Sequence, residues 1–279
     1  MLTIVYGLAS ALVWGAGDFT GGIVSRKTDA PRAVLFGGGA GLFYLLVAAI
    51  LTDAPRPDLP ALLWSAAAGA VGMTGLLLLY HAFAVGQISL AAPISALLSA
   101  ALPIVVGLWW EGLPELPNLA GFGLALAAIW LISSHGSAKQ NKQVRWRDLG
   151  PAFLSGIFFG LYFIFMERGS QQTALWPMVT SRAAGILVVL TYMSFAHRPF
   201  LPPRSVWPLI ALNGLLDVTG NGLYVLAAQV GRLDIAAVLG SLYPASTVFL
   251  ARLFLHERLT PAQARGVFLA FLAIVLMTI

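Results

Sequence analysis

The sequence predicts an all-α integral membrane protein with ten transmembrane helices, arranged as two inverted five-helix repeats. The first observation is composition: 59% of the 279 residues are hydrophobic and 10% are charged, whereas soluble domains carry roughly 25% charged residues. The second is a series of apolar segments long enough to cross a bilayer, which takes about 20 residues. The third is a repeat of the first half of the chain in the second half.

Ten predominantly apolar segments follow one another with short connections. They span residues 3–24, 33–52, 60–84, 88–109, 117–134, 150–168, 174–196, 205–228, 233–254 and 261–279. We expect no extramembrane domain, because little chain lies between them. The first segment lacks a basic n-region and a small-residue cleavage site, so we expect a retained helix and not a signal peptide.

The two halves align at a shift of 145 residues. This shift places Ser10 on Ser155, Gly15 on Gly160, Gly69 on Gly214, Gly75 on Gly220 and Gly86 on Gly231. The predicted organisation is a first repeat (1–136), a basic connecting loop (137–149) and a second repeat (150–279). Because each repeat has an odd number of helices, the second must cross the membrane in the opposite sense. Such repeats place a substrate site near the bilayer midplane, between the halves.

Charge and cysteine content narrow the function classes. The formal net charge is +5 and the isoelectric point is about 9.8, but the basic residues lie in short loops. Membrane orientation and anionic lipids explain them better than nucleic acid does. The chain has no Cys, which excludes disulfides, thiolate metal sites and cysteine nucleophiles. We expect neither a metal nor a cofactor.

A polar stripe inside the eighth segment is the main candidate site. Asn213, Asp217, Asn221 and Tyr224 recur at spacings of four, four and three, which places them on one face of a helix. A carboxylic acid at the bilayer centre costs roughly 3 kcal/mol or more, so it calls for a function or a partner. One further carboxylate, Asp18, lies in the first segment.

Two interpretations of these carboxylates remain open. Asp217 and Asp18 could exchange a proton or bind the ammonium group of a substrate. Alternatively, Asp217 is capped by Asn213, Asn221 or a neighbouring hydroxyl, and Asp18 reaches the membrane interface near Arg26 and Lys27.

Several other polar or aromatic residues are candidates, each with a plainer alternative. His81 could share a proton with a carboxylate, or could be an interfacial group. Tyr80 and Tyr224 could contact a substrate, or could belong to an interfacial aromatic belt. Trp14 could line a cavity or simply pack in the first helix.

The remaining candidates lie near prolines or stand alone. Pro93, Pro103 and Pro244 are expected to interrupt the fourth and ninth helices, which favours Tyr243 as a cavity residue. Ser95 and Ser99 form a mild polar stripe or join helices together. Arg182 could bind a substrate carboxylate, extend towards the surface, or pair with Glu167.

Three motifs resemble a known family. Trp14-Gly15, the stretch Ser241–Pro244, and Glu257-Arg258-Leu259-Thr260 followed by Gln263 and Gly266 are similar to the drug/metabolite transporter superfamily, and the five-helix duplication resembles its EamA-type members. The first-half copy, Glu111-Gly112-Leu113-Pro114, lacks the Arg. The resemblance implies a multi-pass carrier in the cell (inner) membrane, usually an exporter of small metabolites such as amino acids.

The sequence therefore predicts a secondary transporter that works by alternating access, with a small-molecule substrate, possible proton coupling through Asp217, and function as a monomer. One alternative is an intramembrane aspartyl protease, because Gly15-Ala16-Gly17-Asp18 matches the GxGD signature and Asp217 could be the second acid. The order of the two acids is reversed relative to those proteases. A passive facilitator is the other alternative.

Overall fold

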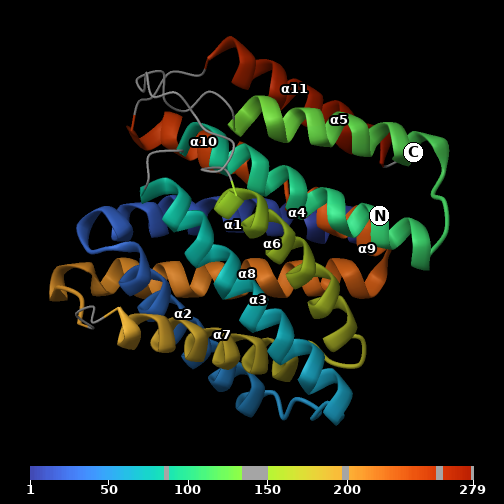
Figure 1. Ribbon diagram of the computed structural model, residues 1–279. Coiled ribbons are helices and arrows are strands. Elements are labelled where there is room, and N and C mark those ends of the chain that lie inside the picture. The colour runs from blue at the N-terminus through green and yellow to red at the C-terminus, as the bar shows by residue number, and fades with distance from the viewer. Residues whose placement is uncertain (85–87, 134–149, 197–200, 256–259, 278–279) are drawn as a thin grey trace.

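The computed structural model describes residues 1–84, 88–133, 150–196, 201–255 and 260–277, which form α-helices and no strand (Figure 1). The helices are α1 (Leu2–Lys27), α2 (Ala30–Leu51), α3 (Leu59–Ala84), α4 (Ile88–Trp110), α5 (Leu116–Ser133), α6 (Gly150–Gly169), α7 (Leu175–Phe195), α8 (Trp207–Val230), α9 (Leu233–Gly240), α10 (Tyr243–Leu255) and α11 (Pro261–Leu276), with a 3-10 turn, η2 (Arg204–Val206).

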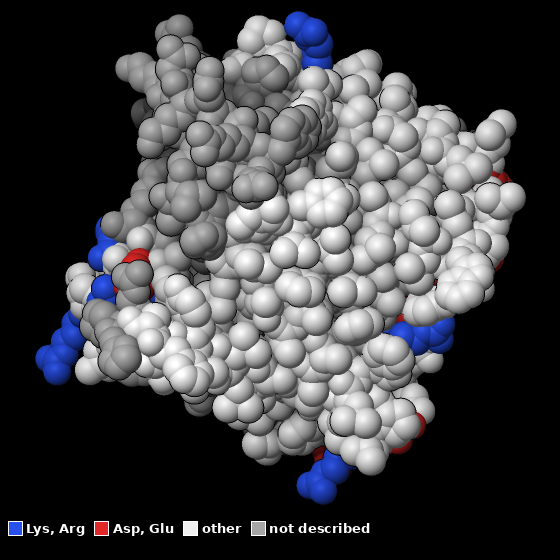
Figure 2. All heavy atoms as spheres, in the orientation of Figure 1, with Lys and Arg blue, Asp and Glu red and all other residues white. Residues whose placement is uncertain are grey.

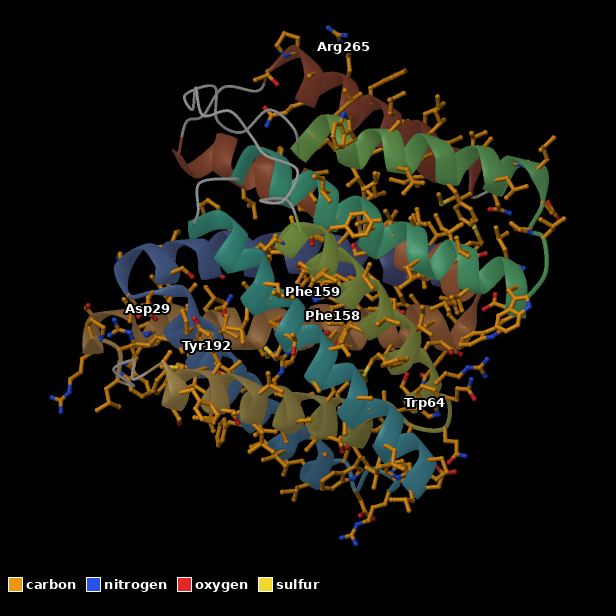
Figure 3. The ribbon with its side chains drawn as sticks, in the orientation of Figure 1. Asp29, Trp64, Phe158, Phe159, Tyr192 and Arg265 are labelled. Carbon is orange, nitrogen blue, oxygen red and sulfur yellow. The ribbon has the colours of Figure 1, made fainter. Side chains whose placement is uncertain are left out.

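Local sequence explains several helix ends. The side chain of Asp29, labelled in Figure 3, accepts a hydrogen bond from the backbone N–H of Arg32 and caps α2. At α11, Thr260 and Gln263 form a reciprocal capping box, and Pro261 occupies the first turn. These residues satisfy N–H groups that a helix start leaves without partners.

Prolines behave differently in the two helices where we expected interruptions. The ninth segment breaks at Ser241–Leu242 into α9 and α10, immediately before Tyr243-Pro244, because proline has no N–H to donate to the carbonyl four residues before it and is accepted in the first turn of a new helix. The expected interruption of the fourth helix is wrong: α4 runs unbroken through Pro93 and Pro103. Membrane helices tolerate proline where neighbouring helices satisfy the freed carbonyl groups.

The described helices match the ten predicted segments in position. Six of them are long and apolar enough to cross a membrane by length and composition: α1, α2, α3, α6, α7 and the helix that contains α8. The other four segments coincide with shorter apolar helices: Ile94–Trp110, Leu116–Ile132, Leu233–Ser246 and Pro261–Leu276. The chain is thus a helical membrane protein with several spans.

Helices pack on corresponding partners in the two halves. The most extensive contact of α1 is with α8, and that of α6 is with α3; α2 packs on α8 as α7 packs on α3. Similarly, α1 contacts α9 and α10 while α6 contacts α4, and α5 lies beside α11 (Figure 1). Each half therefore builds its packing mainly with the other half.

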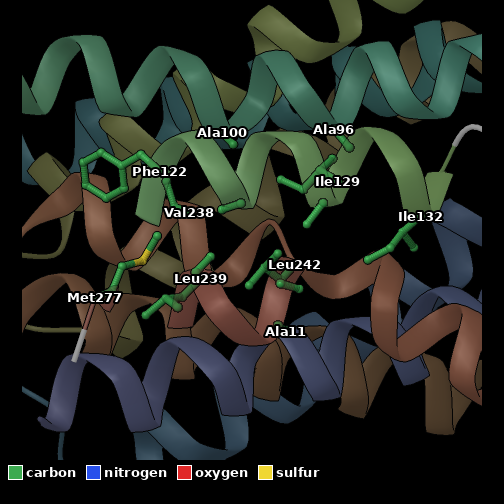
Figure 4. Close-up of a cluster of buried hydrophobic side chains, with 14 of the residues drawn as sticks. Ala11, Ala96, Ala100, Phe122, Ile129, Ile132, Val238, Leu239, Leu242 and Met277 are labelled. Carbon is green, nitrogen blue, oxygen red and sulfur yellow. The ribbon is translucent and has the colours of Figure 1, made fainter. Parts of the chain in front are cut away.

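Small side chains allow this close packing. In the cluster drawn in Figure 4, Phe122, Ile129 and Ile132 of α5 meet Val238 and other side chains from α4, α9 and α11. A methyl group at Gly266 would lie 2.9 Å from the backbone nitrogen of Ile132. Glycine and alanine at helix contacts are typical of packing in lipid.

The outer surface is apolar. Figure 2 shows a broad uncharged face, with the Lys, Arg, Asp and Glu side chains gathered towards its edges. Leu12, Phe43 and Leu187 are each more than 60% exposed. An apolar surface of this extent is expected only where lipid covers it.

Candidate functional site

An ion pair between α7 and α8 lies at the centre of the candidate site. Arg182 donates through Nη2 to Oδ2 of Asp217, and the two side chains are 12% and 36% exposed. Asp217 lies ten residues into the 24-residue α8, about 15 Å from its start. Arg182 thus does not pair with Glu167, which instead lies 3.6 Å from Arg168.

Glycines of α2 make room for the arginine. A methyl group at Gly38 would lie 3.8 Å from Cδ of Arg182, and one at Gly41 would lie 3.8 Å from its Nε. The guanidinium is therefore held between α2 and α8 and is aimed at Asp217.

A second pair of polar side chains joins α8 to α6. The hydroxyl of Tyr162 donates to Oδ1 of Asn221, and Nδ2 of Asn221 donates to the backbone carbonyl of Asp217 at 2.6 Å. The Tyr162 ring rests on α3 at Gly72, where a methyl group would lie 2.9 Å from Cδ2. Asn221 thus supports the backbone of Asp217 and does not cap its carboxylate.

Asn213 connects the stripe to α1. Its Nδ2 donates to the carbonyl of Gly17 at 2.8 Å, and the hydroxyl of Ser10 donates to the carbonyl of Gly220 at 2.8 Å. These bonds show that α1 and α8 run antiparallel, with Gly17 beside Asp217. Asp18 therefore lies at the depth of Asp217, and not at the end of α1 beside Lys27.

Asp18 faces the interior of the bundle. Val5 and Leu12, 60% and 63% exposed, mark the outer face of α1; Asp18 lies about 120° to 140° from them at 100° per residue. Asp18 is nevertheless accessible to solvent, although protein atoms surround its carboxylate. The carboxylates of Asp217 and Asp18 repel each other, and Asp18 has no ion-pair partner among the described residues.

Tyr224 and Trp14 take part in packing. Tyr224 is fully buried, its hydroxyl donates to the carbonyl of Phe163 at 2.9 Å, and its ring lies 5.9 Å from that of Trp14. The Trp14 ring fills the space beside Gly220 and Gly240. The four residues of the stripe thus contact four different helices: α1, α2, α6 and α7.

The other predicted residues lie away from the ion pair. Buried Ser95 and Ser155 share a hydrogen bond of 3.1 Å between α4 and α6, and Ser99 bonds to the carbonyl of Ala96. Tyr243 begins α10 and packs on the α5 side of the bundle. The backbone of Tyr80 and His81 is helical, but their side chains lie outside the described part of the structure, as do residues 257 and 258 of the third motif.

The prediction missed two features of this cluster. Tyr162 is not among the predicted site residues, and Arg182 was not predicted to pair with Asp217. The repeat held a signal: at the shift of 145, Tyr162 corresponds to Gly17, Arg182 to Gly37 and Asp217 to Gly72. Polar residues of the second half thus stand where the first half has glycine.

Comparisons with known proteins place this fold. The sequence profile of the EamA-like transporter family matches residues 1–134 and again residues 150–279. An uncharacterized protein of Methanocaldococcus jannaschii is 27% identical over 126 residues, which are 45% of this chain and 92% of that protein. A protein of known crystal structure superposes with a TM-score of 0.75 at 15% identity, over 99% of this chain and 96% of its own; this likeness shows the fold alone. Because the two profile matches cover most of the sequence, the chain belongs to the EamA-like transporter family, within the drug/metabolite transporter superfamily.

Proposed function

We propose that this protein is a secondary transporter of small metabolites, with a substrate site at the polar cluster between α1, α6, α7 and α8. The proposal includes ten spans in two inverted five-helix repeats, alternating access, export, a cell (inner) membrane location and function as a monomer. Corresponding helices of the two halves pack on corresponding helices of the other half, which supports the repeat. So does the Methanocaldococcus jannaschii relative, which is about half as long as this chain and matches over 92% of its length.

Charge balance at the cluster carries the proposal. Arg182 contributes one positive charge and Asp217 and Asp18 contribute one negative charge each, so the cluster has one carboxylate in excess. An unpaired charge at membrane depth costs several kcal/mol, and such a group is neutralised by a proton or by a bound cation. We therefore assign coupling to Asp18, in place of Asp217, which Arg182 already neutralises.

An amino acid fits this arrangement of charges. Its carboxylate would compete with Asp217 for the guanidinium of Arg182, which has five donors. Its ammonium group would replace the proton on Asp18. Binding of substrate and binding of the proton would then exclude each other, which is the requirement for exchange of the two across the membrane.

No observation favours the alternatives. In an aspartyl protease the two acids share a proton and activate water, whereas here Asp217 is engaged by Arg182. A passive facilitator would have no need of an excess carboxylate at membrane depth.

Transport by purified protein in liposomes tests the proposal. Labelled amino acids and amines are supplied with and without a pH gradient, after a thermal-shift screen selects the ligands. We expect saturable uptake that the gradient accelerates and that Asp18→Asn makes independent of the gradient. Asp53→Asn, an exposed loop acid, is the matched control. Uptake that is equally gradient-dependent in Asp18→Asn would refute the assignment of coupling, and no ligand shift or uptake would refute the function.

A further inference from the structure

A charged cluster joins the two halves at one end of the bundle, where α4 ends and α9 begins. Arg232, between α8 and α9, donates through Nη2 to the carbonyl of Gly112 at 2.7 Å and through Nη1 to the carbonyl of Glu111 at 3.2 Å. It also donates through Nη2 to Oδ2 of Asp234 at 2.7 Å and through Nε to Oδ1 at 3.1 Å. Oε1 of Glu111 in turn accepts from the backbone N–H of Leu233 at 3.0 Å. We call these three charged residues, Glu111, Arg232 and Asp234, the clasp.

The clasp crosses between the halves. Glu111 and Gly112 follow α4 in the first half, while Arg232 and Asp234 belong to the second. Asp234 is fully buried, and a methyl group at Gly107 of α4 would lie 2.9 Å from its Cβ. A buried carboxylate is stable here because Arg232 and the N–H of Ile235 satisfy it.

The clasp is also able to open. Arg232 and Glu111 are 26% and 31% exposed, so water can replace the hydrogen bonds between the end of α4 and the start of α9 when these separate. The net contribution of a hydrogen bond to stability is only about 1 kcal/mol when water competes for the same groups. Asp234 would keep its bonds to Arg232, because both lie in the second half and move together.

In the sequence, the second-half residues of the clasp have neutral counterparts in the first half. Arg232 and Asp234 correspond to Gln87 and Ser89 at the shift of 145. The charges that Arg232 and Asp234 contribute to the clasp therefore belong to the second half alone.

We propose that the clasp is the gate that closes this end of the transport pathway, and that its contacts from Arg232 and Leu233 to Glu111 and Gly112 break when the end of α4 separates from the start of α9. This inference rests on the proposed transport function, since alternating access requires the helices around the pathway to separate at one end at a time.

A single cysteine in the natively cysteine-free chain tests the gate. Leu233 is 1% exposed, and its backbone N–H donates to Glu111 across the clasp, so separation of α4 from α9 would uncover it. In Leu233→Cys we measure the rate of labelling by a water-soluble maleimide in liposomes. We expect labelling to accelerate at least tenfold when Arg232→Gln and Asp234→Asn are added together, which leaves no buried carboxylate without its cation, and to a smaller extent with Glu111→Gln, which keeps an acceptor for the N–H of residue 233. Arg56→Gln, an exposed arginine in the loop between α2 and α3, is the control.

The outcomes separate the gate from the transport function. Faster labelling in the double variant Arg232→Gln/Asp234→Asn and in Glu111→Gln, with melting temperatures near that of the parent, supports the gate whether or not a substrate has been found. Unchanged labelling in both of these variants overturns it, even if transport is confirmed. Equal acceleration by Arg56→Gln also overturns it, since the effect would then not depend on the clasp.

Discussion

Removal of the Arg182 charge is the most direct test of the ion pair. In Arg182→Gln the carboxylate of Asp217 loses its cation and remains on the inward side of α8, about 200° from exposed Leu215. In the double variant Arg182→Gln/Asp217→Asn both charges are removed, and two neutral amides occupy the same space.

The exposure of the two side chains sets how much unfolding free energy is lost in Arg182→Gln. Breaking a fully buried pair costs about 3 to 5 kcal/mol, whereas exposed pairs contribute about 0 to 1 kcal/mol. With Arg182 12% and Asp217 36% exposed, we expect an intermediate value of about 2 kcal/mol for Arg182→Gln, or roughly a 30-fold change in the unfolding equilibrium. The double variant should regain most of this, because no uncompensated charge remains.

Reversible unfolding in detergent or lipid measures the four unfolding free energies of the double-mutant cycle. Arg168→Gln is the comparison, since Arg168 also lies near a carboxylate but is 37% exposed; because its guanidinium also stacks on the Trp110 ring, we expect a loss of about 1 kcal/mol. Additive effects of Arg182→Gln and Asp217→Asn would refute the reasoning, because additivity means that the two charges do not interact in the folded protein.

Three further predictions follow from named contacts. Asp18→Asn should weaken substrate binding, seen as a smaller thermal shift, because the ammonium group loses its carboxylate, and the binding that remains should no longer depend on pH; binding that keeps the parental pH profile would contradict the role of Asp18. Gly69→Ala should lower the melting temperature strongly, because the methyl group would lie 1.8 Å from the backbone oxygen of Ser181, whereas Gly39→Ala, with nothing within 4 Å, should change it little. Burial raises the pKa of Glu111 in the folded protein above its ordinary value of 4.5. Between 4.5 and the raised pKa, Glu111 is therefore protonated in the folded protein and ionised in the unfolded chain. The free energy of unfolding should fall as pH rises through this window. Denaturation at several pH values should show this slope in the parent and not in Glu111→Gln.

The sequence alone predicted much of the fold. Runs of about 20 apolar residues and the repeated glycines led to the helical segments, and the motifs from Trp14-Gly15 to Gly266 led to the family, which the match over both halves confirms. The break of the ninth segment was also predictable, because proline removes a hydrogen bond from its own helix. The continuity of α4 through Pro93 and Pro103 was not, because it depends on which helices surround those prolines.

The site was less predictable, because helical spacing defines a face and not the neighbour of that face. The recurrence of Asn213, Asp217 and Asn221 indicated an inward stripe. It could not show that Asn213 contacts α1, Asp217 contacts α7 and Asn221 contacts α6. The partner of Asp217 is 35 residues away in the chain, and Arg182 by itself was compatible with a surface position.

The duplication explains why Tyr162, Arg182 and Asp217 have no polar counterparts in the first half. Gly17, Gly37 and Gly72 of the first half are the counterparts of Tyr162, Arg182 and Asp217. In the structure Gly72 is the surface on which Tyr162 rests, Gly37 lies against Asn213, and Gly17 lies beside Asp217. Larger side chains at these three positions would occupy the space that the second half's polar groups now fill. The loss of symmetry at these positions is therefore a packing requirement: the second half supplies the ion pair and the tyrosine, and the glycines of the first half supply the room in which they lie.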